Sequence, residues 1–116
     1  MKILAYIESR SGRINQTTLE LISFAASLDS AAEAVIAVHI GDLAETEANK
    51  LKSYGASKLI RLKNDRLEKG LDNKAYAYAI SEIAQKENAT KIVFSNNNTA
   101  KAIAPRIAVK LNASYL

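Results

Sequence analysis

The sequence contains no cysteine and no tryptophan, and it has only one histidine, one proline and four glycines among its 116 residues. Without cysteine, disulfides, thiolate nucleophiles and sulfur-ligated zinc or iron–sulfur sites are excluded. A single histidine also argues against a metal site. No run is long and apolar enough to span a bilayer, and Glu8 and Arg10 interrupt the first apolar run too early for a signal peptide. These absences favour a cytoplasmic protein with no metal centre and no membrane insertion.

The charges are numerous but mixed. Apolar residues make up 48% of the chain and charged residues 24%, which is the balance of a folded globular protein, and the length is that of one domain. The formal net charge is +4, but acidic residues lie among the basic ones throughout. A nucleic-acid interface would need the basic residues gathered on one face with stacking aromatics. We therefore expect a solvated surface and no nucleic-acid partner.

Short apolar runs alternate with helical patterns along the chain. Strands are predicted at 3–7, 34–40, 58–62 and 91–95, and helices at about 15–28, 43–54, 73–86 and after residue 99. This alternation predicts an α/β fold, a three-layer sandwich with a parallel sheet between helices. The strand at 58–62 alternates basic and apolar residues, which favours an edge position. Residues 113–116 read as the start of a fifth strand.

Three local signals mark helix ends. Asn15 is placed to cap the first helix. Asp42, followed three residues later by Glu45, resembles a capping box that would start the second helix near Leu43. Gly55 stands where that helix would need a left-handed residue after its last turn.

Ligands of parallel α/β folds usually bind beyond the carboxyl ends of the strands, which points to the loops at 8–14, 41–42, 63–72 and 95–99. The first loop contains only Gly12, so neither a dinucleotide fingerprint nor a phosphate loop is present. Glu8 is either a functional carboxylate or a solvated strand end. His39, alone on an apolar strand, is expected to be a hydrogen-bonded core or rim residue rather than a catalytic base.

The asparagine tract after residue 94 is the best candidate for a binding loop. If Thr99 caps the next helix, then Asn96, Asn97, Thr99, Lys101 and the free N–H groups of that helix would form an anion site. Simple capping is an equally open interpretation. A phosphate that approaches the backbone closely usually requires glycine, and this loop has none.

Pro105 interrupts an otherwise complete apolar helical stripe. It cannot donate a hydrogen bond to the Lys101 carbonyl and would cost about 3 kcal/mol in a regular helix interior. Either the regular helix begins close to Pro105, or the helix is kinked there. Both alternatives place Arg106 beside the irregularity.

Residues 99–111, with Ala-Pro-Arg at 104–106 ahead of an apolar helix, resemble a segment of the electron transfer flavoprotein alpha subunit family. The opening strand ending in Glu8, the turn at Gly12 and the junction at residues 54–56 are similar to the same family. The family usually has glycine where this chain has Ala100.

The resemblance implies a flavodoxin-like or adenine-nucleotide-hydrolase-like fold and a single alpha-type domain over residues 1–116. In that family this domain is a scaffold without catalytic residues, which pairs with a beta subunit, and FAD is held mainly by a carboxyl-terminal domain that this chain does not include. FAD carries electrons from dehydrogenases, such as acyl-CoA dehydrogenases of fatty acid β-oxidation, to a quinone reductase. The related beta subunit holds AMP and the alpha domain does not. We therefore expect the loop at 95–99 to be empty, and Pro105 and Arg106 to face a partner domain.

Two other functions remain open. The fold alone would also suit a stand-alone universal-stress or adenine-nucleotide-binding module. A small enzyme that uses Glu8 and His39 is a third possibility, which would require both side chains to face one pocket.

Overall fold

The computed structural model describes residues 2–27, 34–63, 73–94 and 98–111. The strands are β1 (Lys2–Ile7), β2 (Ala34–Ile40), β3 (Lys58–Leu62) and β4 (Ala89–Phe94). The helices are α1 (Gln16–Ser27), α2 (Glu45–Ser53), α4 (Asn73–Lys86) and α5 (Asn98–Leu111). The predicted alternation of strands and helices is thus confirmed over the described residues.

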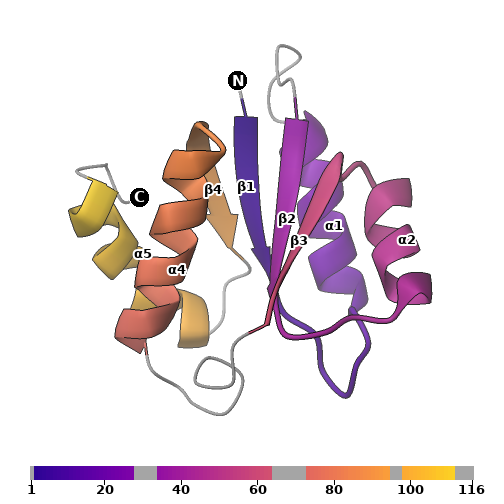
Figure 1. Ribbon diagram of the computed structural model, residues 1–116. Coiled ribbons are helices and arrows are strands. Elements are labelled where there is room, and N and C mark those ends of the chain that lie inside the picture. The colour runs from indigo at the N-terminus through magenta and orange to yellow at the C-terminus, as the bar shows by residue number, and fades with distance from the viewer. Residues whose placement is uncertain (1, 28–33, 64–72, 95–97, 112–116) are drawn as a thin grey trace.

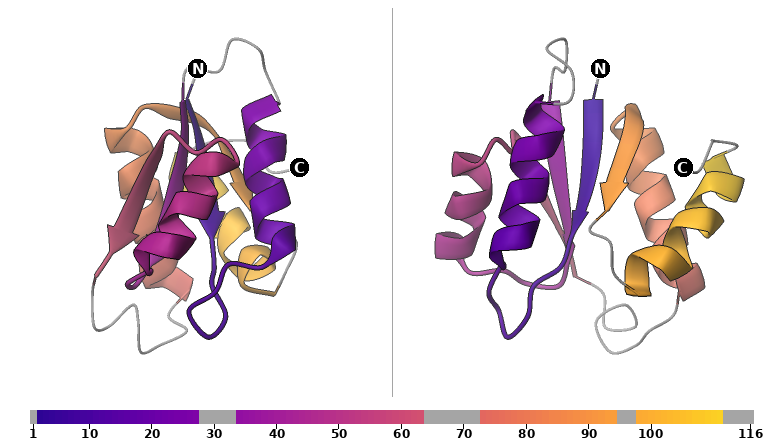
Figure 2. Two further views of the ribbon diagram at one scale, coloured as in Figure 1. Left: turned by 90° about the vertical axis from the view of Figure 1, so that its right-hand side faces the viewer. Right: turned by 180° about the vertical axis from the view of Figure 1, so that it is seen from behind.

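The four strands form one parallel sheet in the order β3-β2-β1-β4 (Figure 1). Helices α1 and α2 cover one face, and α4 and α5 lie on the other, as both views in Figure 2 show. The result is the predicted three-layer sandwich. β3 lies at an edge of the sheet, as its alternating pattern indicated.

Alternate residues of each strand divide the core into two clusters. Ile3, Ala5 and Ile7 of β1 pack toward α1 and α2, whereas Leu4 and Tyr6 pack toward α4 and α5. The central strands β1 and β2 are buried on both faces. This explains why they appear in the sequence as continuous apolar runs.

The helix-end predictions had different outcomes. The cap at Asn15 is confirmed, because its Oδ1 accepts a 2.9 Å hydrogen bond from the Thr18 N–H. Gly55 is also confirmed, with φ of 122°, and the Ala56 N–H closes the end of α2 on the Leu51 carbonyl at 3.0 Å.

The capping box at Asp42 is wrong. α2 begins at Glu45, and its N-cap residue is Ala44, which makes no side-chain capping bond. The Asp42 carboxylate instead forms a 2.9 Å ion pair with Lys63, just after β3. A contact with a distant residue therefore replaces the local bond that the sequence suggested.

Of the two alternatives at Pro105, a regular helix that begins close to it is wrong, and a kink stays a prediction. α5 begins at Asn98 and continues through Pro105 to Leu111, so Thr99 lies within the first turn and not before it. Pro105 is exposed, while Ile103 and Ile107 are buried in the cluster beneath α4 and α5. We attribute the tolerance of an interior proline to this packing, which compensates for the lost hydrogen bond. The predicted fifth strand at 113–116 lies outside the described residues.

Candidate functional site

The strand order reverses beside β1, which is where ligands of doubly wound sheets usually bind. At the carboxyl ends of the two strands that meet there, Tyr6 of β1 is paired in register with Phe94 of β4. Their rings lie 6.0 Å apart, centroid to centroid, at an interplanar angle of 56°. Glu8 follows immediately after β1. This end of the sheet therefore presents aromatic rings and a carboxylate.

Two tyrosines near this end of the sheet have raised pKa values. Burial, and then the nearby charge of Glu8, raise the pKa of the Tyr6 phenol well above its ordinary value. The same two causes raise the pKa of Tyr76, on α4. Burial is therefore the main cause of both shifts, and the charge of Glu8 adds to it.

His39 is held by hydrogen bonds on both ring nitrogens. Its Nδ1 lies 2.9 Å from the Gly41 carbonyl oxygen, and its Nε2 lies 2.8 Å from the Ser9 hydroxyl. Because a carbonyl can only accept, Nδ1 carries the proton, and in the neutral ring Nε2 then accepts from the Ser9 hydroxyl. The ring is buried, with 4% of its surface exposed. The prediction of a hydrogen-bonded core histidine is confirmed.

Glu8 and His39 do not form a common site. The alternation along β2 directs His39 toward α1 and α2, the same face as Val35 and Ala37. The charge of Glu8 instead contributes to the raised pKa values of Tyr6 and Tyr76, which belong to the opposite cluster. The arrangement required by the hypothesis of a small enzyme is therefore not found.

The predicted anion loop is only partly described. Asn96 and Asn97 lie outside the described residues, and Thr99 and Lys101 belong to the first turn of α5. The Lys101 side chain is exposed. The anion site therefore stays a prediction.

The two residues predicted to face a partner are at the surface. Pro105 and Arg106 are both exposed on α5, next to the buried residues Ala104 and Ile107. Whether a partner covers them also stays a prediction.

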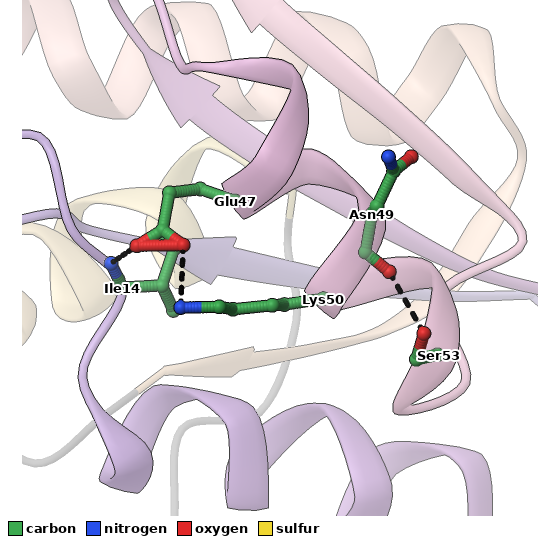
Figure 3. A network of polar contacts seen from close by, with 5 residues as sticks. All are labelled: Ile14, Glu47, Asn49, Lys50 and Ser53. Carbon is green, nitrogen blue, oxygen red and sulfur yellow. Dashed lines mark hydrogen bonds and ion pairs between the residues drawn. The ribbon is translucent and has the colours of Figure 1, made fainter.

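Sequence reasoning missed a buried carboxylate that ties the first loop to α2 (Figure 3). One oxygen of Glu47 accepts a 3.2 Å hydrogen bond from the Ile14 N–H, and the other lies 2.8 Å from Lys50 Nζ. The hydrogen bond from Lys50 is the main reason why the pKa of Glu47 is lowered, and the Ile14 N–H adds to it. The spacing of Glu47 and Lys50 predicts a helical ion pair. Nothing in the sequence indicates the contact with Ile14, 33 residues away.

Within residues 2–27, 34–63, 73–94 and 98–111, no group of three or more histidine, cysteine, aspartate or glutamate side chains could hold a metal ion. In the same part of the chain, no helix has both the length and the apolar character needed to cross a membrane.

Fold and site together define a doubly wound, flavodoxin-like α/β domain without a phosphate-binding loop at the end of its first strand. Comparison with protein families narrows this class, because the electron transfer flavoprotein domain matches residues 3–116. The chain belongs to the electron transfer flavoprotein family. The resemblance found in the sequence is thus confirmed.

Individual relatives agree with this assignment. The chain is 25% identical to electron transfer flavoprotein subunit alpha of Bacillus subtilis (strain 168) over 115 residues, which is 99% of this chain and 35% of that protein. It is 30% identical over 110 residues to the alpha subunit of Thermoanaerobacterium thermosaccharolyticum, covering 94% of this chain and 33% of the relative. It is also 29% identical over 111 residues, 95% of this chain and 30% of the relative, to acryloyl-CoA reductase electron transfer subunit beta of Anaerotignum propionicum. The chain thus spans about a third of the length of these relatives.

Proposed function

We propose that this chain is the amino-terminal scaffold domain of an alpha-type electron transfer flavoprotein subunit and has no catalytic residue of its own. The observation that carries this proposal is the family match over residues 3–116, combined with a chain that spans about a third of its relatives. We propose that the protein works in the cytoplasm, paired with a beta-type subunit. The pair would pass electrons from dehydrogenases, such as acyl-CoA dehydrogenases of β-oxidation, to a quinone reductase.

FAD is the cofactor implied by the family, and the described residues of this chain do not fit it well. A flavin dinucleotide carries a diphosphate, which doubly wound sheets usually hold with a glycine-rich loop after the first strand, and residues 8–14 contain no such sequence. Gly12, the glycine of the first loop, is used in a surface turn instead of a phosphate cradle. We therefore propose that FAD is held by the part of the protein that corresponds to the unmatched two thirds of the relatives.

The alternative function is a stand-alone adenine-nucleotide-binding module, which the switch-point topology would suit. The first loop argues against it, because residues 8–14 contain no phosphate-binding sequence. The two functions predict opposite results in one pair of experiments.

The first experiment mixes the purified chain with the beta-type subunit from the same genome and measures the mass of the product by light scattering after gel filtration. We expect a one-to-one complex, and no flavin absorbance near 450 nm in the chain alone. Arg106→Glu, in the predicted interface, should weaken the complex about tenfold. Lys52→Gln, an exposed change on α2 at the opposite face, should not.

The second experiment titrates AMP and ATP into the chain in a calorimeter. Saturable nucleotide binding together with no complex would replace the scaffold proposal by the nucleotide-binding module. Flavin bound stoichiometrically by the chain alone would contradict the assignment of FAD to the rest of the protein.

A further inference from the structure

The first loop forms a small β-hairpin at residues 10–13, here called the arginine hairpin. The backbones of Arg10 and Arg13 exchange two hydrogen bonds, at 2.9 and 3.0 Å. Between them, Ser11 and Gly12 both have positive φ angles, 53° and 77°. Positive φ at both central residues defines the type I′ turn that favours tight hairpins. The hairpin extends past the carboxyl edge of the sheet, as the violet loop in Figures 1 and 2 shows.

Both ends of the arginine hairpin are tied to the body of the domain. On one side, the Ser9 hydroxyl donates to the buried His39. On the other, the Ile14 N–H donates to Glu47, and the Ile14 side chain is buried in the core. Asn15 then caps α1. The hairpin is therefore a rigid projection that needs little further ordering.

The hairpin presents two cations to solvent. Arg10 and Arg13 are both exposed, and no ion pair joins either to another residue within the described ranges. Glu47, the described carboxylate whose pKa is affected by Arg13, is already bound to Lys50 and to the Ile14 N–H. The two guanidinium groups are thus available to an external anion.

We propose that the arginine hairpin is a docking element for paired carboxylates on the surface of another protein chain. Guanidinium groups bind carboxylates in a bidentate geometry, and arginine is enriched among the residues that dominate protein interfaces. A rigid hairpin should also bind more tightly than a flexible one, because less conformational freedom is lost on binding. The proposal does not rest on the function proposed above.

The shape and composition of the hairpin favour a protein partner over other anions. Sites for small ligands are concave, whereas the space around a Cβ built on Gly12 is empty to 4 Å and the four residues project into solvent. A single-stranded nucleic acid would require a longer cationic track with stacking aromatics. The hairpin offers two cations and no aromatic ring.

The test uses the whole chain labelled with nitrogen-15 and an acetylated hexaglutamate peptide as the probe. We expect the peptide to shift the amide resonances of residues 10–13 saturably, with weaker binding at higher salt. R10Q/R13Q should weaken binding about tenfold. The matched control, K52Q/K91Q, removes the same charge from exposed lysines on α2 and β4 and should bind as the wild type does. A hexaglutamine peptide should not bind.

A second arm tests the rigidity of the hairpin. Ser9→Ala keeps both arginines but removes the bond to His39, and we expect the peptide to bind two- to threefold more weakly. Equal weakening by R10Q/R13Q and K52Q/K91Q would show a general charge effect and overturn the proposal. Inorganic phosphate or hexauridylate producing the same shifts at lower concentration would also overturn it, because the hairpin would then be a phosphate or nucleic-acid site. Absence of any shift at residues 10–13 would do so as well.

Discussion

Both halves of the domain combine an apolar core with polar side chains that bridge distant elements, but several bridges of the first half lie at the carboxyl edge of the sheet. In the amino-terminal half (residues 2–63), polar side chains bridge elements that are distant in the sequence: Ser9 to His39, Glu47 to Ile14, Arg61 to Glu45 and Lys63 to Asp42. In the carboxyl-terminal half (residues 73–111), the Glu87 carboxylate pairs with Lys58 and the Thr90 hydroxyl donates to the Lys2 carbonyl, both at the amino ends of the strands. The side chains through which α4 and α5 pack in the core include Ala77, Ile80, Ala84, Ile103 and Ile107.

The polar bridges and the apolar packing have different roles in the fold. Hydrogen bonds and ion pairs have strict geometry, so the polar bridges fix the loops at the carboxyl edge, including the arginine hairpin. Apolar packing is less directional and tolerates irregular features, and α5 accordingly contains Pro105. We infer that the polar bridges of the first half set the positions of the loops at the carboxyl edge of the sheet.

The largest expected effect comes from truncating the core of each half. Ile80→Ala in α4 and Leu51→Ala in α2 each remove a side chain that is 0% exposed, at a cost of about 2 to 5 kcal/mol. If the two apolar clusters are stabilised separately, hydrogen exchange should show Ile80→Ala loosening α4 and α5 more than α1 and α2. Leu51→Ala should loosen α2 and the first loop. A uniform loss of protection in both variants would remove the distinction.

Gly55→Ala tests the tight corner between α2 and β3 in the first half. Gly55 has a φ of 122°, and an added Cβ would lie 2.9 Å from the Ala26 Cβ of α1, so we expect a loss of about 2 to 3 kcal/mol in urea unfolding. The matched control is Gly12→Ala, where φ is 77° and nothing lies within 4 Å. That variant should lose only about 1 kcal/mol. Equal losses would mean that backbone conformation alone, and not the contact with α1, determines the cost.

The features of the fold that depend on local signals could be predicted from the sequence. The Asn15 cap and the Gly55 helix end depend on residues within one turn, and both are confirmed. The parallel sheet follows from the alternation of strands and helices, because that alternation leaves few topologies.

The rest depends on contacts that no local pattern reveals. Ser9 and His39 are 30 residues apart, and Ile14 and Glu47 are 33 apart. Asp42 does not cap α2 and forms an ion pair with Lys63 instead. At Pro105, the local rule predicted either a helix start or a kink, and α5 is continuous from Asn98 to Leu111 with Ile103 and Ile107 packed in the core.

Ser81→Ala tests a buried hydroxyl of α4, in the second half, and should change stability less than the core truncations do. Ser81 is 4% exposed, and its hydroxyl has no hydrogen-bond partner among the described residues. Removing an unsatisfied buried hydroxyl should raise the free energy of unfolding by about 1 kcal/mol. The control in the first half is Ser23→Ala, which removes a 3.3 Å hydrogen bond to the Tyr54 carbonyl at an exposed site and should be neutral or slightly destabilising. A loss of stability in Ser81→Ala would mean that the hydroxyl is satisfied.

The smallest expected effect is the pH dependence of the Glu47 bridge. Its pKa is lowered from the ordinary value of 4.5 by Lys50 and by the Ile14 N–H, so the folded state favours the charged carboxylate. The resulting stabilisation is fully present above about pH 4.5 and is lost as the pH falls through the lower folded-state value. Glu47→Gln removes the titrating group, so the difference in unfolding free energy between wild type and variant should shrink as the pH falls from 7 to 3. At neutral pH the variant should also exchange the Ile14 amide faster, while the amides of α4 stay unchanged. If the difference in unfolding free energy does not vary with pH, Glu47 stabilises the first loop by packing and not by its charge.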